Sequence, residues 1–395
     1  MIFRSRAQAF LPNALRMQTI DTQMFRPHVR DLSQLTDQNR RRKLIPRAGI
    51  DFASNDYLGM ASSSKLSAAV ATAIANGVPI GSGGSRLLGG NHPEHEALEE
   101  EAARFFGSES TLYFSSGYAA NATLLSTLPQ RGDLIVYDEL IHASAHEGMR
   151  LGRAECRPAP HNQVDGFDDV IAEWHKAGGT GQIWIAVESL YSMDGDRAPL
   201  TDFAALARRH DAYLLIDDAH GTGVFGPDGR GLAAPFDGDE NVIVLRTCGK
   251  ALGCEGALLC GPQVMRDFLV NRGRAFIFST APSPLMAAAV RASLRLLVEE
   301  PERRTRLHDL IGIATTALAP FGALASGSQI MPVILGDDAR TMRVALSIQA
   351  AGFDVRGIRP PTVPAGTSRL RISLTLNVDP TDVAALATTL SEALQ

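Results

Sequence analysis

The chain has 395 residues, of which 45% are apolar and 21% charged, and its formal net charge is −5. This length predicts two or three domains, and the composition is typical of a globular protein. The interspersed charges exclude the basic field that nucleic-acid binding requires, and no apolar run approaches the roughly 20 residues that span a bilayer. The four cysteines, none in a C-x-x-C pair, are typical of free thiols in a reducing compartment, so we expect a soluble cytoplasmic protein.

The first twenty residues contain Arg4, Arg6 and Arg16 and no acid. This pattern favours a loosely docked extension, with an organellar transit peptide as the alternative. We expect an N-terminal extension and arm over residues 1–55. Its basic run, Arg40–Lys43, is typical of a solvated helix face, or else forms a rim that attracts phosphates or a carboxylate.

From about residue 65 onward, short apolar runs alternate with helical patterns. Several runs are continuously apolar, which is typical of strands that helices cover on both faces. The alternation predicts an α/β fold with an open, mostly parallel sheet. The expected strands are Thr111–Phe114, Leu134–Tyr137, Ile183–Val187, Tyr213–Ile216, Val242–Leu245 and Ala257–Leu259, and the expected helices are Pro93–Phe106, Ala119–Thr127 and Thr201–His210.

The pattern changes near residues 281–284, where two prolines precede a helical stretch over residues 285–299. We therefore expect a large domain over residues 56–285 and a smaller C-terminal α/β domain over residues 286–395. The smaller domain contains the apolar runs Ile330–Leu335, Phe353–Ile358 and Leu370–Leu374 and a final helix over residues 380–394.

Polar residues that follow the strands are the candidate site, because ligands of open α/β sheets bind beyond the carboxyl ends of the strands. After the first strand, Gly117 permits a tight turn into a helix whose free N–H groups favour a phosphate, although such a glycine also occurs for purely structural reasons. After the second strand, His142 can stack on an aromatic ring or act as an acid. Neither the His142–His146 spacing nor that of His92 and His95 comes with a third ligand, so no metal is expected.

Two further strands end in charged residues. Asp217 could keep a pyridine nitrogen protonated, and the alternatives are a helix-capping acid or a magnesium site. Lys250 lies in a glycine-containing loop; desolvation would make its amine a nucleophile, whereas a surface lysine is the alternative. Together the four strand ends meet the requirements of pyridoxal phosphate: a phosphate cradle, a stacking histidine, an acid for the ring nitrogen and a Schiff-base lysine.

These features resemble the α-oxoamine synthases, which are fold-type-I pyridoxal-phosphate transferases. The resemblance covers about residues 35–395, nearly the whole chain. It is carried by the stretches Ser54–Gly59, Gly81–Arg86, Ser192–Asp196, Asp217–Gly223 and Ile358–Thr367.

The resemblance implies a role for each matching residue. Lys250 holds the cofactor covalently, Asp217 pairs with the ring nitrogen and His142 stacks on the ring; these three are the expected catalytic residues. The implied cofactor contacts are Gly117, Tyr118, His142, Ser192, Asp217, His220, Thr247, Lys250 and Thr280, the last from the partner subunit of a homodimer with shared active sites. The implied substrate contacts are Arg40, Asn55, Arg359, Thr362 and Arg371.

The stretch Ile358–Thr367 most resembles the family member that condenses L-alanine with a pimeloyl thioester, on coenzyme A or a carrier protein, in biotin synthesis. The alternatives are sister synthases that use glycine or serine, such as 2-amino-3-oxobutyrate CoA ligase or 5-aminolevulinate synthase. A non-catalytic scaffold subunit of the same fold is the remote alternative, and the presence of Lys250 argues against it.

Overall fold

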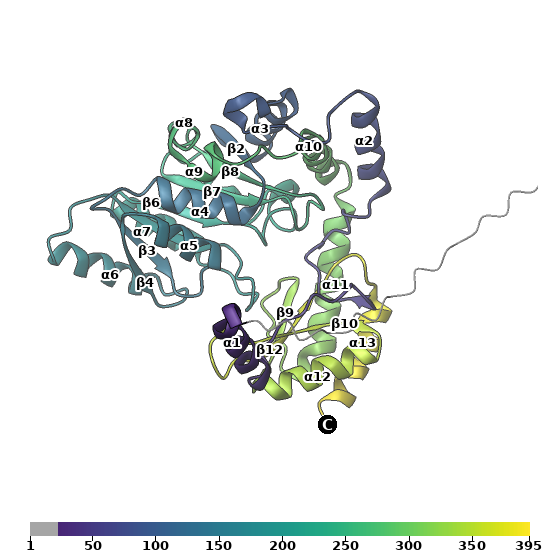
Figure 1. Cartoon of the computed structure of the whole chain (residues 1–395). Helices are drawn as coiled ribbons and strands as arrows, with labels where there is room; N and C mark the ends of the chain where they lie inside the picture. The colour runs from purple at the N-terminus through teal and green to yellow at the C-terminus, as the bar shows by residue number, and fades with distance from the viewer. Residues whose placement is uncertain (1–22) are drawn as a thin grey trace, which may run out of the picture. The chain divides into compact units, whose positions relative to one another are not determined.

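The computed structural model describes residues 23–395, which fall into two units that divide after Ile45. In the first unit, α1 (Arg26–Asp37) begins with a proline in its first turn. Of the extension and arm expected over residues 1–55, residues 1–22 lie outside the described residues. A short 3-10 helix (Gln23–Phe25) precedes α1. Residues 46–395 form the second unit, which contains the helices α2 to α13 and the strands of the described residues (Figure 1).

A seven-stranded sheet is the centre of the second unit, in the order β2-β8-β7-β6-β5-β3-β4. Strand β8 runs antiparallel to its neighbours β2 and β7, and the other pairs are parallel, which confirms the mostly parallel sheet. The strands are β2 (Ser110–Phe114), β3 (Leu134–Asp138), β4 (Glu155–Ala159), β5 (Ile183–Glu188), β6 (Tyr213–Asp217), β7 (Val242–Thr247) and β8 (Ala257–Gly261).

Helices cover both faces of this sheet, which explains the continuous apolar runs of its strands. One apolar cluster joins one face to α4, α5, α8 and α9, and a second joins the other face to α3, α6, α7 and α10. The helices are α2 (Ser64–Ala75), α3 (Pro93–Phe106), α4 (Gly117–Thr127), α5 (Ala143–Leu151), α6 (Val164–Lys176), α7 (Leu200–Arg209), α8 (Gln263–Arg272), α9 (Arg274–Ile277) and α10 (Pro284–Glu299).

A three-stranded antiparallel sheet follows, in the order β11-β12-β9. Near it, the short strand β1 (Ile50–Asp51) pairs in parallel with β10 (Phe353–Asp354). The remaining elements are β9 (Ile330–Gly336), β11 (Arg356–Ile358), β12 (Ser368–Ser373), α11 (Glu302–Leu318), α12 (Asp338–Ala350) and α13 (Pro380–Ala393). The domain boundaries expected at residues 55 and 285 stay a prediction.

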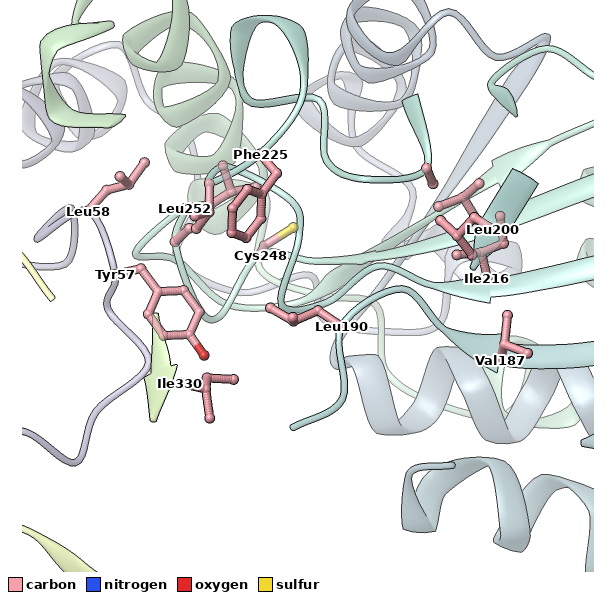
Figure 2. Close-up of a cluster of buried hydrophobic side chains, with 14 of the residues drawn as sticks. Tyr57, Leu58, Val187, Leu190, Leu200, Ile216, Phe225, Cys248, Leu252 and Ile330 are labelled. Carbon is pink, nitrogen blue, oxygen red and sulfur yellow. The ribbon is translucent and has the colours of Figure 1, made fainter. Parts of the chain in front are cut away.

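One continuous core links the two sheets. Figure 2 shows Tyr57 and Ile330 on the side of the small sheet, with Leu252, Phe225 and Leu190 from the loops of the large sheet beside them. All five side chains are buried in the same apolar cluster. This packing holds β9 and the segment around residue 57 against the carboxyl ends of the large sheet's strands.

The expected strands of the large sheet agree with the observed ones to within two residues, but β4 was missed. It reads Glu155–Ala159, contains Pro158 and pairs only with β3, so it is a partly exposed edge strand without an apolar pattern. The expected strand Phe353–Ile358 is divided into β10 and β11. None of the helices within residues 23–395 has the length and apolar character that crossing a membrane requires.

Candidate active site

The carboxyl ends of four neighbouring strands bring the site together. Lys250 follows β7, Asp217 ends β6, Glu188 ends β5 and His142 follows β3, and these strands are adjacent in the sheet. Glu188 and Asp217 are paired in register, so their side chains project from the same edge. The structure thus brings together residues that lie more than 100 positions apart in the sequence.

The Asp217 carboxylate is held by two donors. The Asn121 side-chain amide donates to Oδ2 at 2.8 Å, and the Ala219 backbone N–H donates to Oδ1 at 3.1 Å. Asn121 also donates to the Ser144 hydroxyl at 3.1 Å. Donors of this kind stabilise the charged carboxylate and fix its orientation at the end of the strand.

Lys250 is half-buried, and its amine makes no hydrogen bond or ion pair with any residue from 23 to 395. Burial lowers the pKa of this amine to about 8, although the nearby carboxylates of Asp217 and Glu188 oppose the shift. The cationic Arg371 lowers the pKa further. Roughly a tenth of the amine is therefore neutral at pH 7, against well under a thousandth for an ordinary lysine, and the neutral form is the one that acts as a nucleophile or base.

Glu188 is the buried partner of this group. Its side chain is 3% exposed, and its Oε1 atom has no hydrogen-bond partner within the described part of the chain. Burial, with the Asp217 charge next to it, raises the pKa of Glu188 well above its ordinary value. Of the two paired carboxyls, Asp217 is therefore the one suited to carry the negative charge.

Two histidines lie on this edge. His142 caps α5: its Nδ1 accepts the Ser144 backbone N–H at 3.2 Å and lies 2.7 Å from the Ser144 hydroxyl. His142 is partly exposed, yet the burial of the rest of the residue lowers the pKa of the ring, helped by Lys250 and opposed by Asp217. His220 is buried, and burial together with Lys250 and Arg371 lowers the pKa of its ring well below the ordinary range.

Arg371, from β12 of the small sheet, is buried at this site without a carboxylate partner among residues 23–395. Its guanidinium donates to the Ser192 carbonyl at 2.6 Å, the Ser373 hydroxyl at 2.6 Å and the Asn55 side-chain oxygen at 3.1 Å. The Tyr57 hydroxyl donates to the same Asn55 oxygen at 3.0 Å. A buried arginine with only neutral acceptors is suited to bind an anionic ligand.

The Tyr57 hydroxyl also connects this group to the histidine. It lies 2.6 Å from His220 Nδ1, and the Gln329 side chain donates to the His220 carbonyl at 2.8 Å. Burial raises the pKa of Tyr57. A chain of hydrogen bonds therefore runs from Arg371 through Asn55 and Tyr57 to His220.

The start of α4 presents backbone donors to the same edge. The Ser116 hydroxyl accepts the Ala119 N–H at 3.1 Å, while the N–H groups of Gly117 and Tyr118 have no acceptor within residues 23–395. A Cβ atom at Gly117 would lie 3.7 Å from the Thr247 hydroxyl, so the glycine and Thr247 are neighbours. Free N–H groups at a helix N-terminus beside a hydroxyl form a typical anion site.

Four other predicted residues are described by their own surroundings. Thr280 is exposed and makes no hydrogen bond to the residues described above. Arg359 and Thr362 lie in the loop between β11 and β12, where the Thr362 N–H donates to the Arg359 carbonyl at 3.1 Å. Arg40 follows α1 in the first unit. The roles of these four residues stay predictions.

Three residues of the site were not singled out from the sequence: Glu188, Tyr57 and Asn121. Glu188 ends an apolar strand just as Asp217 does, so a charged residue at the end of a buried run could have indicated it. Tyr57 and Asn121 each lie within a stretch that was singled out, but their contacts depend on segments far away in the sequence. Across residues 23–395, no cluster of three or more His, Cys, Asp or Glu side chains is arranged to hold a metal.

The family model for aminotransferase class I and II matches residues 47–390. The chain belongs to this family. Within it, the chain is one of the α-oxoamine synthases. It is 44% identical over 331 residues to 8-amino-7-oxononanoate synthase of Chromobacterium violaceum, covering 83% of this chain and 85% of the relative.

Solved structures of this aminotransferase family share the fold. A structure of serine palmitoyltransferase (SPT) with pyridoxal phosphate (PLP) matches with a TM-score of 0.83 and 27% identity, covering 94% of this chain and 97% of that one. An 8-amino-7-oxononanoate synthase from Francisella tularensis matches with a TM-score of 0.74 and 26% identity, covering 88% of this chain and 98% of that one. The fold-type-I assignment made from the sequence is confirmed, and the chain is an enzyme with pyridoxal 5′-phosphate as its cofactor.

The residues at the strand ends fit this cofactor. The unpaired Lys250 amine suits an aldehyde, and the fixed Asp217 carboxylate suits a protonated ring nitrogen. The unpaired N–H groups of Gly117 and Tyr118, with Thr247 beside them, suit a phosphate. Within residues 23–395, the Lys250 amine and the two N–H groups have no protein partner, whereas the Asp217 carboxylate is fixed by its two donors.

Proposed function

We propose that the chain catalyses the decarboxylative condensation of L-alanine with a pimeloyl thioester, which is the 8-amino-7-oxononanoate synthase reaction of biotin synthesis. The observation that carries this proposal is that the Lys250 amine and the Arg371 guanidinium lie in one site with Asp217. Within residues 23–395 the amine makes no hydrogen bond, and the guanidinium has no carboxylate partner. A base and a carboxylate-binding group would thereby lie at one site. The names of the relatives, which are 40–44% identical, support the choice of this reaction.

Pyridoxal phosphate, when bound, supplies an aldehyde that links to amines and a ring that withdraws electrons from the attached carbon. We propose that Lys250 holds the cofactor and that Asp217 keeps a proton on its ring nitrogen. His142 would stack on the ring, while Ser192 and His220 would contact its hydroxyl oxygen. The Asn121 amide, which donates to Asp217 Oδ2 at 2.8 Å, would hold the carboxyl group in this position.

The phosphate would be held by the start of α4. Within residues 23–395, the N–H groups of Gly117 and Tyr118 have no protein acceptor, and the hydroxyl of Thr247 lies next to Gly117. The positive end of the α4 dipole adds to this attraction. Thr280 of a second copy is proposed as the remaining phosphate contact, because it is exposed and free to reach another subunit.

The alanine carboxylate would be bound by Arg371 and Asn55. Two planar N–H donors of the guanidinium can grip a carboxylate at both oxygens, which orients the bond to be broken. Lys250, with a pKa lowered to about 8, would then take the proton from the alanine Cα and later return a proton to the product. The alanine Cα would then bond to the thioester carbonyl carbon as the carbon–sulfur bond breaks and the thiol leaves. Carbon dioxide would be lost from the alanine carboxyl group.

The acyl donor would be bound by less central residues. Arg359 and Thr362, in the loop between β11 and β12, are proposed to lie along the acyl chain, and Arg40 is proposed to attract an anionic part of the donor. We also propose a homodimer, as Thr280 requires, and a cytoplasmic location. The location is supported by the four cysteines, all of which are free thiols.

The test is the mass of the product. The purified holoenzyme is incubated with L-alanine and pimeloyl-coenzyme A, and in parallel with pimeloyl carrier protein, glycine plus acetyl-coenzyme A, and glycine plus succinyl-coenzyme A. We expect 8-amino-7-oxononanoate and release of labelled carbon dioxide from carboxyl-labelled alanine, with Lys250→Ala as the inactive control. Faster turnover of glycine with a short acyl thioester would refute the proposal in favour of a sister synthase.

A further inference from the structure

A third histidine, His161, lies between two carboxylates at the same edge of the large sheet. It follows the edge strand β4 by two residues. Its Nδ1 lies 2.8 Å from Asp138 Oδ1, and its Nε2 lies 2.8 Å from Asp196 Oδ2. These two carboxylates come from the ends of two other segments, so His161 connects three parts of the chain.

The hydrogen-bonding pattern sets the charge of this ring. A carboxylate accepts hydrogen bonds but cannot donate them, so both ring nitrogens must donate and the ring is an imidazolium. Burial lowers the pKa of His161, but the bonds to Asp138 and Asp196 outweigh it and raise the pKa to about 10. Around it, Glu139 accepts the His161 backbone N–H at 3.0 Å, and the Tyr191 ring stands perpendicular to the His161 ring with 4.4 Å between the ring centres.

Both carboxylates are fixed by additional donors. Asp138 is fully buried and accepts the backbone N–H groups of Leu140 at 2.9 Å and Asn162 at 2.8 Å. The Asn162 side chain donates to Asp196 at 2.7 Å. His161 and Asn162 therefore each bond to both acids. The His161 ring can make its two hydrogen bonds only in the orientation that points Nδ1 at Asp138 and Nε2 at Asp196.

Each acid lies at one end of a loop or turn that contains a residue of the proposed site. Asp138 ends β3, four residues before His142. Asp196 closes the turn that contains Ser192, because the Tyr191 N–H donates to the Asp196 carbonyl at 2.9 Å and the Gly195 N–H donates to the Tyr191 carbonyl at 2.9 Å. Movement of either acid would displace the loop that begins or ends there.

We propose that His161 is a positioning residue, whose doubly donating ring ties the loop of His142 to the turn of Ser192 and so sets the place of both against the cofactor. This inference rests on the proposed cofactor contacts of His142 and Ser192. His161 itself does not touch the site; it acts through the two acids.

The test uses the holoenzyme and measures release of the cofactor after dilution, together with the visible circular dichroism of the bound cofactor. In His161→Gln, one carboxylate faces an amide oxygen, so we expect release at least about tenfold faster and an altered dichroism band. Changing Asp196→Asn in the same chain restores a donor–acceptor match, because each amide then offers both a donor and an acceptor. We expect this double variant to return to within about threefold of the wild-type release rate.

His175→Gln, at an exposed histidine bonded to the Gly179 carbonyl, is the matched control and should change neither readout.

Wild-type release and dichroism in His161→Gln would overturn the proposal. A folded double variant that stays as impaired as the single variant would overturn it as well, since a general packing defect is not repaired by an acid-to-amide change. If the single variant fails to fold, the double variant alone decides between these outcomes. His142→Ala tests the proposed function on which this inference rests. Unchanged cofactor release in His142→Ala would refute the proposed contact between His142 and the cofactor. Unchanged release in His161→Gln alone would refute only the positioning role of His161.

Discussion

Two buried polar clusters begin at adjacent residues, Asp217 and Asp218, and they differ in how their charges are paired. Asp218 faces Arg246, whose guanidinium donates to it at 3.0 Å and to Asp237 at 2.6 Å. Ser189 also donates to Asp218, at 2.5 Å. In this ion cluster, defined by Arg246, Asp218 and Asp237, the one cation is fully buried between two acids.

The cluster around Asp217 is different because, in the part of the chain that the structure describes, neither Lys250 nor Arg371 makes an ion pair with an acid, although Asp217 and Glu188 lie near Lys250. Lys250 has no hydrogen-bonding partner, and Arg371 contacts only neutral oxygens, within residues 23–395. Burial of an uncompensated charge is costly, so such groups persist where a ligand completes them. The comparison teaches that paired buried charges hold this fold together, whereas unpaired ones indicate where it binds and reacts.

The largest expected effect comes from removing the unpaired amine. Lys250→Ala should lower turnover by at least about 10⁴-fold, because the change removes both the covalent anchor and the base. Borohydride treatment followed by peptide mass spectrometry should find no cofactor on this chain, while thermal stability stays near that of the wild type. Retained turnover would contradict the assignment of the base.

The ion cluster should respond in stability rather than in chemistry. Arg246→Met leaves the buried Asp218 without a cation among residues 23–395, and it leaves Asp237 with Arg230 alone. It should lower the free energy of unfolding by about 3–5 kcal/mol. Arg371→Met, which leaves no buried acid unpaired, is the matched control and should cost much less. Urea unfolding of both variants measures the difference, and equal losses would remove the distinction between the two clusters.

Substitutions of the adjacent acids Asp217 and Asp218 should likewise differ, the first in its effect on turnover and the second in its effect on stability. Asp217→Asn should lower turnover by about 10²-fold, because an amide no longer supports a protonated ring nitrogen, with little loss of stability. Asp218→Asn should mainly lower the melting temperature. Steady-state kinetics and thermal unfolding of the pair provide the comparison, and a reversed pattern would show that the two roles are exchanged.

A smaller effect is expected from a change that keeps the charge. Arg371→Lys should raise the KM for L-alanine about tenfold with a smaller change in kcat, since a point charge replaces two parallel donors. The KM for the acyl thioester should stay constant. An unchanged KM for alanine would place the carboxylate elsewhere.

The smallest effect is a dependence on pH. Only the neutral amine of Lys250 attacks an aldehyde, and burial lowers the pKa of this amine to about 8. The rate at which the apoenzyme takes up cofactor should therefore rise as the pH increases towards 8 and level off above it. Stopped-flow absorbance measures this rate, and a rise that continues to pH 10 would indicate an ordinary exposed lysine.

Much of the large sheet could be predicted from the sequence, because strands buried on both faces are continuously apolar and the helices between them carry their own periodicity. The edge strand β4 could not, since one side of it is exposed and it contains Pro158. For the same reason His161, which follows β4, gave no signal in the sequence although it contacts acids 23 and 35 residues away.

The sequence by itself determined the order of the strands along the chain, the family, and the identity of Lys250, Asp217 and His142 as polar residues at strand ends. Only the tertiary structure decided their partners: Glu188 beside Asp217, and Arg371 on Asn55, which is 316 residues away in the chain. The reason is physical. Local patterns record which face of a segment is buried, but pairing, desolvation and the resulting pKa values depend on which distant segment supplies the neighbouring charge.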